Sequence, residues 1–164
     1  MSNTSYITID WPQWWKGKGH HCLEGMPFIG THCKVIRTAR LCLQCRSQDL
    51  FKSVWSTNEY SIDQCRSVSE KVREIVHAYI AWPNYYFLPE DRVAILLGVI
   101  PGVWYDAEDP VEDVRKAFHL KGVKDGDASY YDVVLDGKYK DLLDMIIKLN
   151  STRCRESGTK HENA

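Results

Sequence analysis

Apolar residues between Val68 and Ile80 recur every three or four residues, the spacing that gathers side chains on one face of an α-helix. Ser67 and Glu70 stand at the start of this run with the spacing of a capping box, in which each side chain bonds the backbone amide of the other residue. Pro83 follows the run, and the residue before a proline avoids the helical region. The pattern therefore predicts a helix between Ser67 and Pro83.

The later chain carries further helical patterns and one strand pattern. Segments 89–98 and 110–118 each begin with a proline followed by acidic residues, which are favourable at the start of a helix. Segment 139–150 repeats apolar residues at helical spacing. In segment 129–136, by contrast, apolar and polar residues alternate ahead of an Asp-Gly turn pair, and this predicts a strand.

The first third of the chain gives weaker patterns. Segments 6–10 and 34–43 have some two-residue alternation, which predicts two strands, and the apolar residues of segment 50–55 fit one face of a short helix. A chain of 164 residues suits one domain. We therefore expect a single α+β domain over residues 1–150, with a small β-containing N-terminal region packed on a helical C-terminal body, and a flexible tail over 151–164.

Charge and residue types divide this domain unevenly. Residues 1–56 carry a net charge of +4 and hold four of the six cysteines and four of the six tryptophans, whereas the remainder carries −5. The chain as a whole is nearly neutral at −1, which excludes a global preference for polyanions. Residues 1–56 thus form a basic region rich in Cys, His and Trp, and 57–150 an acidic helical region.

A CxxC pair is the main metal-binding pattern, since two thiolates at this spacing can hold one Zn²⁺. The predicted ligands of a structural zinc ion are Cys22, Cys33, Cys42 and Cys45. His20, His21 or His32 could replace either upstream cysteine. Four protein ligands leave no open position on the metal, so the zinc would be structural rather than catalytic. Small buried hydrophobic cysteines are an equally weighted alternative, and disulfides or redox chemistry are further ones.

The acidic region offers a candidate protein-binding surface. Carboxylates and tyrosines are interleaved there, and such a surface suits a basic protein partner because charge steers the encounter and tyrosine anchors the contact. The residues assigned to this surface are Tyr105, Asp106, Tyr130, Tyr131, Asp132, Asp136 and Asp141. For any single carboxylate, a solvated surface group or a helix cap is the simpler interpretation.

The leading hypothesis is a non-enzymatic protein-binding module of the cytosol, with an inhibitor or immunity-type role as its most concrete form. A zinc-stabilised nucleic-acid-binding module is the first alternative, because aromatic and basic residues interleave in the first third of the chain. Its candidate residues are Trp14, Trp15, Lys16, Lys18, Arg37 and Arg40.

An enzyme of unknown chemistry is the second alternative. The sequence contains no nucleophile elbow, no phosphate-binding glycine loop and no HExxH pattern. The first ten residues lack the features of a signal peptide, and the apolar run 93–101 is shorter than the roughly 20 residues of a membrane span, so we expect a cytoplasmic protein with no membrane contact.

Overall fold

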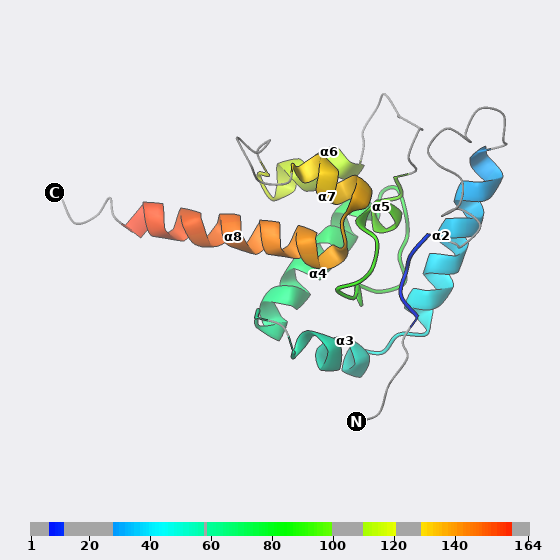
Figure 1. The fold of residues 1–164 in the computed structure, drawn as a ribbon, viewed down its shortest axis with the longest axis horizontal. Coiled ribbons are helices and arrows are strands. Elements are labelled where there is room, and N and C mark those ends of the chain that lie inside the picture. Colours follow the sequence, from blue (N-terminus) through cyan, green and yellow to red (C-terminus); the bar gives the residue numbers. More distant parts are fainter. Residues whose placement is uncertain (1–6, 12–27, 58, 100–109, 121–128, 159–164) are drawn as a thin grey trace.

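The computed structural model describes residues 7–11, 28–57, 59–99, 110–120 and 129–158, and these residues are arranged as helices joined by irregular segments (Figure 1). Within these ranges the β-type pairing is limited to an isolated bridge between Arg92 and Lys138. The expected α+β fold with a β-containing N-terminal region is therefore wrong. The helices are α2 Phe28–Gln44, α3 Gln48–Trp55, α4 Ile62–Val76, α5 Val93–Leu96, α6 Pro110–Ala117, α7 Tyr130–Asp136 and α8 Tyr139–Gly158.

Helix α2 takes the place of the strand predicted over 34–43. Val35, Ala39 and Leu43 are buried and recur every four residues, so they form the inward face of a helix. Side chains that recur every four residues also fit the two-residue alternation of a strand. The short segment 34–43 is therefore compatible with both a helix and a strand. The length of α2, 17 residues, is more than twice that of a typical strand.

Helix α7 takes the place of the strand predicted over 129–136. Its buried residues Tyr130, Val133 and Val134 have helical spacing. Ser129 and Asp132 form a capping box: the Ser129 amide donates to Asp132 Oδ2 at 3.0 Å, and the Asp132 amide donates to Ser129 Oγ at 3.2 Å. The cap satisfies amides that a helix start leaves without partners, and it decides between the two periods in favour of the helix.

The helices predicted at 50–55, 110–118 and 139–150 are confirmed as α3, α6 and α8, and α8 continues to Gly158 into the segment predicted as a tail. Helix α4 begins earlier than predicted, because the capping box that starts it is formed by Ser61 and Gln64. The helix predicted over 89–98 is reduced to the single turn α5.

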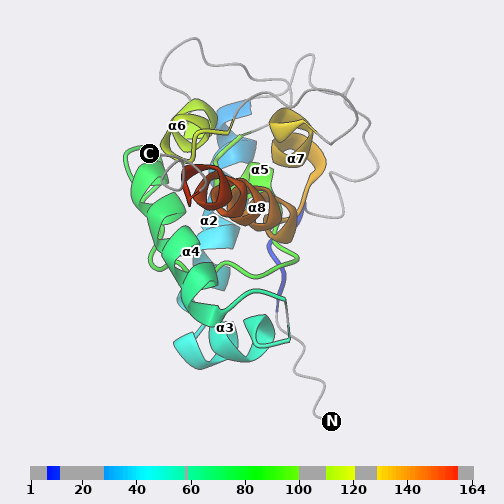
Figure 2. The same ribbon diagram turned by 90° about the vertical axis from the view of Figure 1, so that its left-hand side faces the viewer.

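Helices α4 and α8 pack against each other, and α6 packs on α4 and α7 on α8. Figure 2 looks along α8, with α4 on one side, α7 on the other and α6 above. Helix α5 packs against both α2 and α7, and α3 packs against α4. In Figure 1 α2 lies at one edge of the molecule, and the second half of α8 extends beyond the other helices at the opposite edge.

Large aromatic side chains fill the interior, and the N–H groups of two buried tryptophans are satisfied by backbone carbonyls. The indole N–H of Trp55 donates to the Phe87 carbonyl at 3.0 Å, and that of Trp82 donates to the Leu96 carbonyl at 2.8 Å. Both indoles are almost completely buried. Trp55 of α3 therefore fixes the irregular segment before α5, and Trp82 of that segment ties it to α5, because buried tryptophan needs a partner for its N–H.

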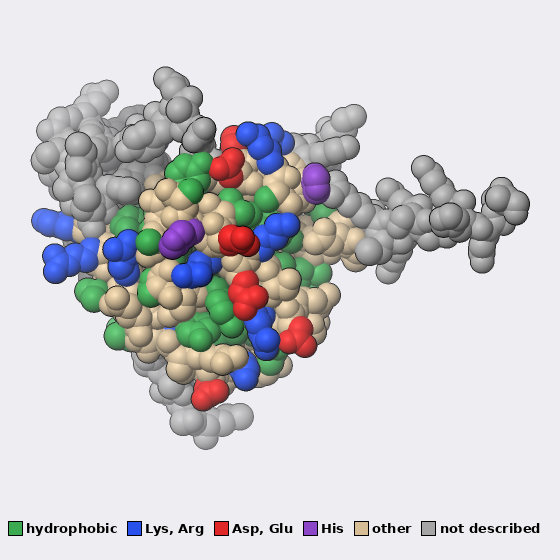
Figure 3. Space-filling view, turned by 180° about the vertical axis from the view of Figure 1, so that it is seen from behind, with side chains coloured by type: hydrophobic (Ala, Val, Ile, Leu, Met, Phe, Trp, Pro, Cys, Tyr) green, Lys and Arg blue, Asp and Glu red, His purple; other side chains and the backbone are tan. Residues whose placement is uncertain are grey.

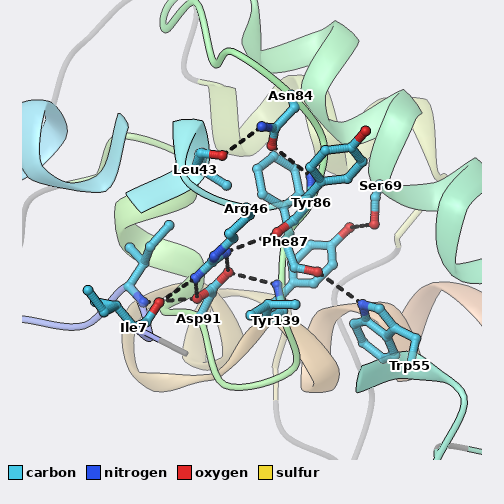
Figure 4. Close-up of polar contacts among 12 residues, drawn as sticks. Ile7, Leu43, Arg46, Trp55, Ser69, Asn84, Tyr86, Phe87, Asp91 and Tyr139 are labelled. Carbon is cyan, nitrogen blue, oxygen red and sulfur yellow. Dashed lines mark hydrogen bonds and ion pairs between the residues drawn. The ribbon is translucent and has the colours of Figure 1, made fainter. Parts of the chain in front are cut away.

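A buried ion pair between Arg46 and Asp91 joins the end of α2 to the same irregular segment (Figure 4). Arg46 Nη1 and Nη2 donate to the two oxygens of Asp91 at 2.6 and 2.7 Å. The pair also holds the N-terminal segment, since the Ile9 amide donates to Asp91 Oδ1 at 2.9 Å and Arg46 Nη2 donates to the Ile7 carbonyl at 2.9 Å. The remaining Asp91 oxygen accepts from the Leu88 amide at 2.7 Å. Asp91 was predicted within a helix, but these contacts hold it in an irregular segment, and helix α5 begins only at Val93.

Candidate binding surface

Helix α6 is held between α4 and α7, and this arrangement places the candidate surface. The buried Tyr130 hydroxyl of α7 donates to the Val111 carbonyl of α6 at 2.8 Å. Val111 and Val114 face the interior, so the intervening carboxylates of Glu112 and Asp113 lie on the outer side of α6. The amphipathic pattern of α6 thus presents two neighbouring carboxylates between the end of α4 and the start of α7.

Glu112 is bonded to a tyrosine of α7. The exposed Tyr131 hydroxyl donates to Glu112 Oε1 at 2.5 Å, and the Arg115 guanidinium forms an ion pair with the other carboxylate oxygen at 2.8 Å. The Arg115 hydrogen bond and, to a smaller extent, the Tyr131 hydrogen bond lower the pKa of the Glu112 carboxyl below its ordinary value. Glu112 is therefore ionised across the neutral pH range and fixes the Tyr131 ring in one orientation.

Asp113 is bonded to a tyrosine that follows α4. The exposed Tyr79 hydroxyl donates to Asp113 Oδ2 at 2.6 Å. Tyr79 is 38% exposed and Tyr131 is 44% exposed, and together they account for two of the large exposed apolar side chains in the described part of the chain. Two outward tyrosines are thus tied by their hydroxyls to adjacent carboxylates of one helix.

We name this arrangement the tyrosine–carboxylate surface and define it by Tyr79, Glu112, Asp113, Tyr131 and Asp132. Its three carboxylates carry −3, and the neighbouring Arg115 and Lys116 offset two of these charges. The surface is therefore only slightly acidic, and ordered phenol rings are its more distinctive feature.

The residues predicted for partner binding fall into three groups. Tyr131, Asp132, Asp136 and Asp141 are exposed, and Tyr131 and Asp132 belong to the tyrosine–carboxylate surface. Tyr130 is fully buried, so its assignment to a contact surface is wrong. Its ring lies in the core, and its hydroxyl donates a hydrogen bond to the Val111 carbonyl. Tyr105 and Asp106 lie outside the described residues.

Two of the exposed carboxylates have local structural roles. Asp132 caps α7, and Asp141 Oδ2 accepts from the Lys138 amide at 2.8 Å at the start of α8. The residues predicted for partner binding do not include Tyr79, Glu112 or Asp113. Tyr79 falls within the apolar run 68–80 that predicts a helix, but α4 ends at Val76 and leaves the Tyr79 ring outside the helix.

Two cysteines of the predicted zinc site, Cys33 and Cys42, lie in α2, and Cys45 follows this helix directly. Cys42 is half-buried in its last turn, Cys45 is exposed just after it, and Cys33 lies in the same helix, nine residues before Cys42. At about 1.5 Å per residue, the Cys33 and Cys42 backbones are about 13 Å apart. Ligands of one tetrahedral zinc lie only about 2.3 Å from the metal, so a zinc shared by both would require α2 to break between them.

No cluster of three or more potential metal ligands occurs among the described residues. Cys22 and the histidines at 20 and 21 lie outside them, and the side chains of Cys33 and His32 are not described. The zinc site stays a prediction. Burial raises the pKa of the Cys42 thiol, which favours its neutral form over the thiolate that binds metal.

The Arg46–Asp91 pair is the most buried charged pair in the described part of the chain, with exposed side-chain fractions of 3% and 0%. The two side chains bond to each other, Asp91 accepts from backbone amides, and Arg46 donates to backbone carbonyls. One of these carbonyls is that of Tyr86, 2.9 Å from Arg46 Nη1 (Figure 4). Both side chains therefore act as structural connections between segments.

The sequence matches no protein-family model, no curated protein and no solved structure. Among the described helices, none is both long enough and apolar enough to span a bilayer.

Proposed function

We propose that this chain is a non-enzymatic binding protein that contacts a basic protein partner through the tyrosine–carboxylate surface. The observation that supports the proposal is the pair of exposed tyrosines, Tyr79 and Tyr131, each hydrogen-bonded to its own carboxylate on α6. An inhibitor or immunity-type protein, which blocks the partner by covering its functional surface, is the concrete form of this proposal.

Ordered tyrosines reduce the entropy cost of binding. An exposed side chain that is free to rotate loses about 0.5–1.5 kcal/mol when a partner immobilises it. The Tyr131 hydroxyl is already held 2.5 Å from Glu112, and the Tyr79 hydroxyl 2.6 Å from Asp113. Part of the ordering has therefore occurred before the partner arrives, and tyrosine is among the residues that most often dominate the energy of an interface.

The carboxylates favour a basic partner. Asp113 and Asp132 are not paired with a base in the described part of the chain, and Glu112 shares its charge with Arg115. An incoming Lys or Arg side chain can lie over a phenol ring and pair with the neighbouring carboxylate in the same contact. The low net charge of the surface implies that the tyrosine rings supply more of the affinity than the carboxylates do.

The test is affinity capture from lysate with the full chain as bait, followed by purified binding of whichever protein is captured. The surface variant combines Asp113→Lys with Tyr131→Ala. The matched control combines Asp49→Lys, an exposed acid in the first turn of α3, with Leu149→Ala, an exposed apolar residue of α8.

The proposal predicts one basic protein that binds the wild type and the control, and that binds the surface variant at least about tenfold more weakly. Its affinity for the wild type should fall moderately as salt is raised, because salt screens the carboxylates but not the tyrosine contacts. A partner that binds all three chains equally would refute the proposal. Equal urea midpoints for the two variants ensure that the comparison measures binding rather than folding.

A further inference from the structure

Helix α2 presents a basic outer face. Val35, Ala39 and Leu43 occupy its inner face. The outer face, together with the residue that follows the helix, is formed by Lys34, Arg37, Thr38, Arg40, Leu41, Gln44 and Cys45, all of which are exposed. Three of these seven side chains are cations. The chain contains no acidic residue between Gly25 and Gln48, so no carboxylate of α2 itself can neutralise them.

The side chains of these three cations form no hydrogen bond or ion pair within the described ranges. Lys34, Arg37 and Arg40 follow one another at three-residue spacing, so each repels the next on the helix surface. None of them forms an ion pair with a carboxylate within the described ranges, whereas Arg46, Arg66, Arg92, Arg115 and Lys138 all do. An arrangement that weakens the helix without a compensating contact points to a ligand that neutralises it.

The outer face of α2 is accessible to a large ligand. The helix lies at one edge of the molecule and packs against α5 on its inner side (Figure 1). In the view from behind, blue side chains gather at the edge formed by α2, and the acidic side chains lie nearer the middle and on the other side (Figure 3). The tyrosine–carboxylate surface belongs to other elements, namely α6, α7 and the turn after α4.

We propose that α2 binds duplex DNA by placing this face in the major groove, with Lys34, Arg37 and Arg40 against the phosphates or the base edges. The segment from Lys34 to Gln44 spans about 15 Å of helix axis, and the major groove, about 12 Å wide, admits one α-helix. Arg, Lys, Thr and Gln are side chains that bond to phosphates and base edges.

Duplex DNA fits this face better than a single strand does. Single strands are held largely by stacking on exposed aromatic rings, and the outer-face residues from Lys34 to Cys45 include no aromatic ring. Duplex RNA is also a poorer fit, because its major groove is too deep and narrow for side chains to read. This interaction is independent of the proposed protein-binding function and involves a different face of the molecule.

The salt dependence of binding measures the number of phosphate contacts. The logarithm of the affinity falls with the logarithm of salt concentration by about 0.9 for each phosphate neutralised on DNA. With all three cations on phosphates the slope is about −2.7, so affinity should drop about 40-fold between roughly 50 and 200 mM salt, and each cation that contacts a base edge instead lowers the slope by about 0.9.

The experiment is fluorescence anisotropy with the full chain and a labelled mixed-sequence duplex of about 20 base pairs, two helical turns. The α2 variant is Lys34→Gln, Arg37→Gln and Arg40→Gln. The control is Lys52→Gln, Lys116→Gln and Lys140→Gln, which makes the same change in net charge at exposed positions of α3, α6 and α8. We expect the α2 variant to lose affinity at least about tenfold and most of the salt slope, and the control to retain both.

A single variant separates binding from folding. Arg37→Glu places a carboxylate three residues from both Lys34 and Arg40, which converts two repulsive neighbours into attractive ones. This variant should unfold at a higher urea concentration than the wild type and still bind duplex DNA at least about tenfold more weakly.

Three outcomes would overturn the proposal. The first is no binding of the duplex by the wild type at about 50 mM salt. The second is an equal loss of affinity in the α2 variant and the control, which would indicate general charge attraction. The third is tighter binding of a single strand of the same length, which would assign the surface to unpaired nucleic acid.

Discussion

Arg46 and Asp91, 45 residues apart in the chain, share two hydrogen bonds of 2.6 and 2.7 Å in the interior of the molecule. Asp91 also accepts the amides of Ile9 and Leu88, and its own carbonyl accepts the Tyr139 amide at 2.7 Å. The two side chains thus connect the N-terminal segment, the end of α2, the segment before α5 and the start of α8. Stability should depend on this pair more than on any surface ion pair of the described residues.

Asp91→Ala tests this dependence. The change leaves the Arg46 guanidinium buried without its counter-charge, which costs about 3–5 kcal/mol of unfolding free energy. The control is Asp63→Ala, which removes an exposed pair with Arg66 and should cost about 0–1 kcal/mol. Urea unfolding followed by circular dichroism measures both. A loss in Asp91→Ala no larger than in Asp63→Ala would show that the pair does not hold these segments together.

Gly137 should not tolerate a side chain. A Cβ at this position would lie 2.4 Å from the Val133 carbonyl oxygen, which is backbone and cannot move without distorting α7. We expect Gly137→Ala to lower the free energy of unfolding by about 1–3 kcal/mol. Lys140→Ala, at an exposed position three residues on, should stay within about 0.5 kcal/mol of the wild type. Thermal unfolding compares the two, and equal midpoints would contradict the prediction.

His119 occupies a backbone conformation that suits glycine. It follows α6 with a φ of +52°, and the Leu120 amide donates to the Arg115 carbonyl at 2.8 Å, which is the bond pattern of a helix that ends with a left-handed residue. We expect His119→Gly to raise the free energy of unfolding by about 0.5–1 kcal/mol.

A second histidine supplies the matched control for this change. His77 is exposed and follows α4 with a φ of −57°. There glycine brings no steric relief and adds freedom to the unfolded chain, so His77→Gly should lower stability. If both substitutions shift the urea midpoint in the same direction, the left-handed conformation of His119 is not a source of strain.

Two cysteines should differ sharply in reactivity. Cys65 is fully buried, and burial raises the pKa of its thiol to about 11, so the thiolate is scarce at pH values near 8. Cys45 is exposed. Iodoacetamide labelling followed by peptide mass spectrometry should modify Cys45 in the folded protein and Cys65 only after urea is added. Equal labelling of the two in the absence of urea would contradict the burial of Cys65.

The Glu112 carboxyl should make stability sensitive to acid. Its pKa is lowered in the folded state, mainly by the hydrogen bond from Arg115. The ionised carboxyl therefore adds its full contribution to the free energy of unfolding at pH values above its unfolded-state pKa of about 4.3. This contribution is lost as the pH falls through the lower folded-state pKa. Glu112→Gln should reduce the drop in the urea midpoint between near-neutral and strongly acidic solution. Glu74→Gln, at an exposed position of α4, is the control and should keep the wild-type drop.

The sequence predicted α6 correctly because the inward residues and the start signals agree there, whereas similar signals placed the start of α4 too late and made α5 too long. In α6, Pro110, the acidic first turn and the spacing of Val111 and Val114 all indicated a helix, and the structure contains it. The short segment 129–136 admits either period, and the deciding feature is the reciprocal bond between Ser129 and Asp132. The spacing of these two residues could have identified the cap, since serine with an acidic residue three positions later is a common helix start.

The candidate surface was predicted only in part, because its tyrosines depend on tertiary structure. Tyr130 and Tyr131 are adjacent in sequence, yet the first is buried against α6 and the second is 44% exposed. Tyr79 contacts Asp113 across 34 residues of sequence. Composition alone indicated acidic and aromatic residues in this half of the chain, and only the packing of α4, α6 and α7 determined which of them reach the surface.

The contact of the N-terminal segment with Asp91 has a consequence for synthesis on the ribosome. Ile9 emerges 82 residues before the carboxylate that binds its amide. Until then, Arg46 lacks its counter-ion, and the apolar face of α2 lacks α5, against which it packs. The nascent first half of the chain consequently exposes an apolar helix face to chaperones, and the native arrangement can close only after the sequence around Asp91 has left the exit tunnel.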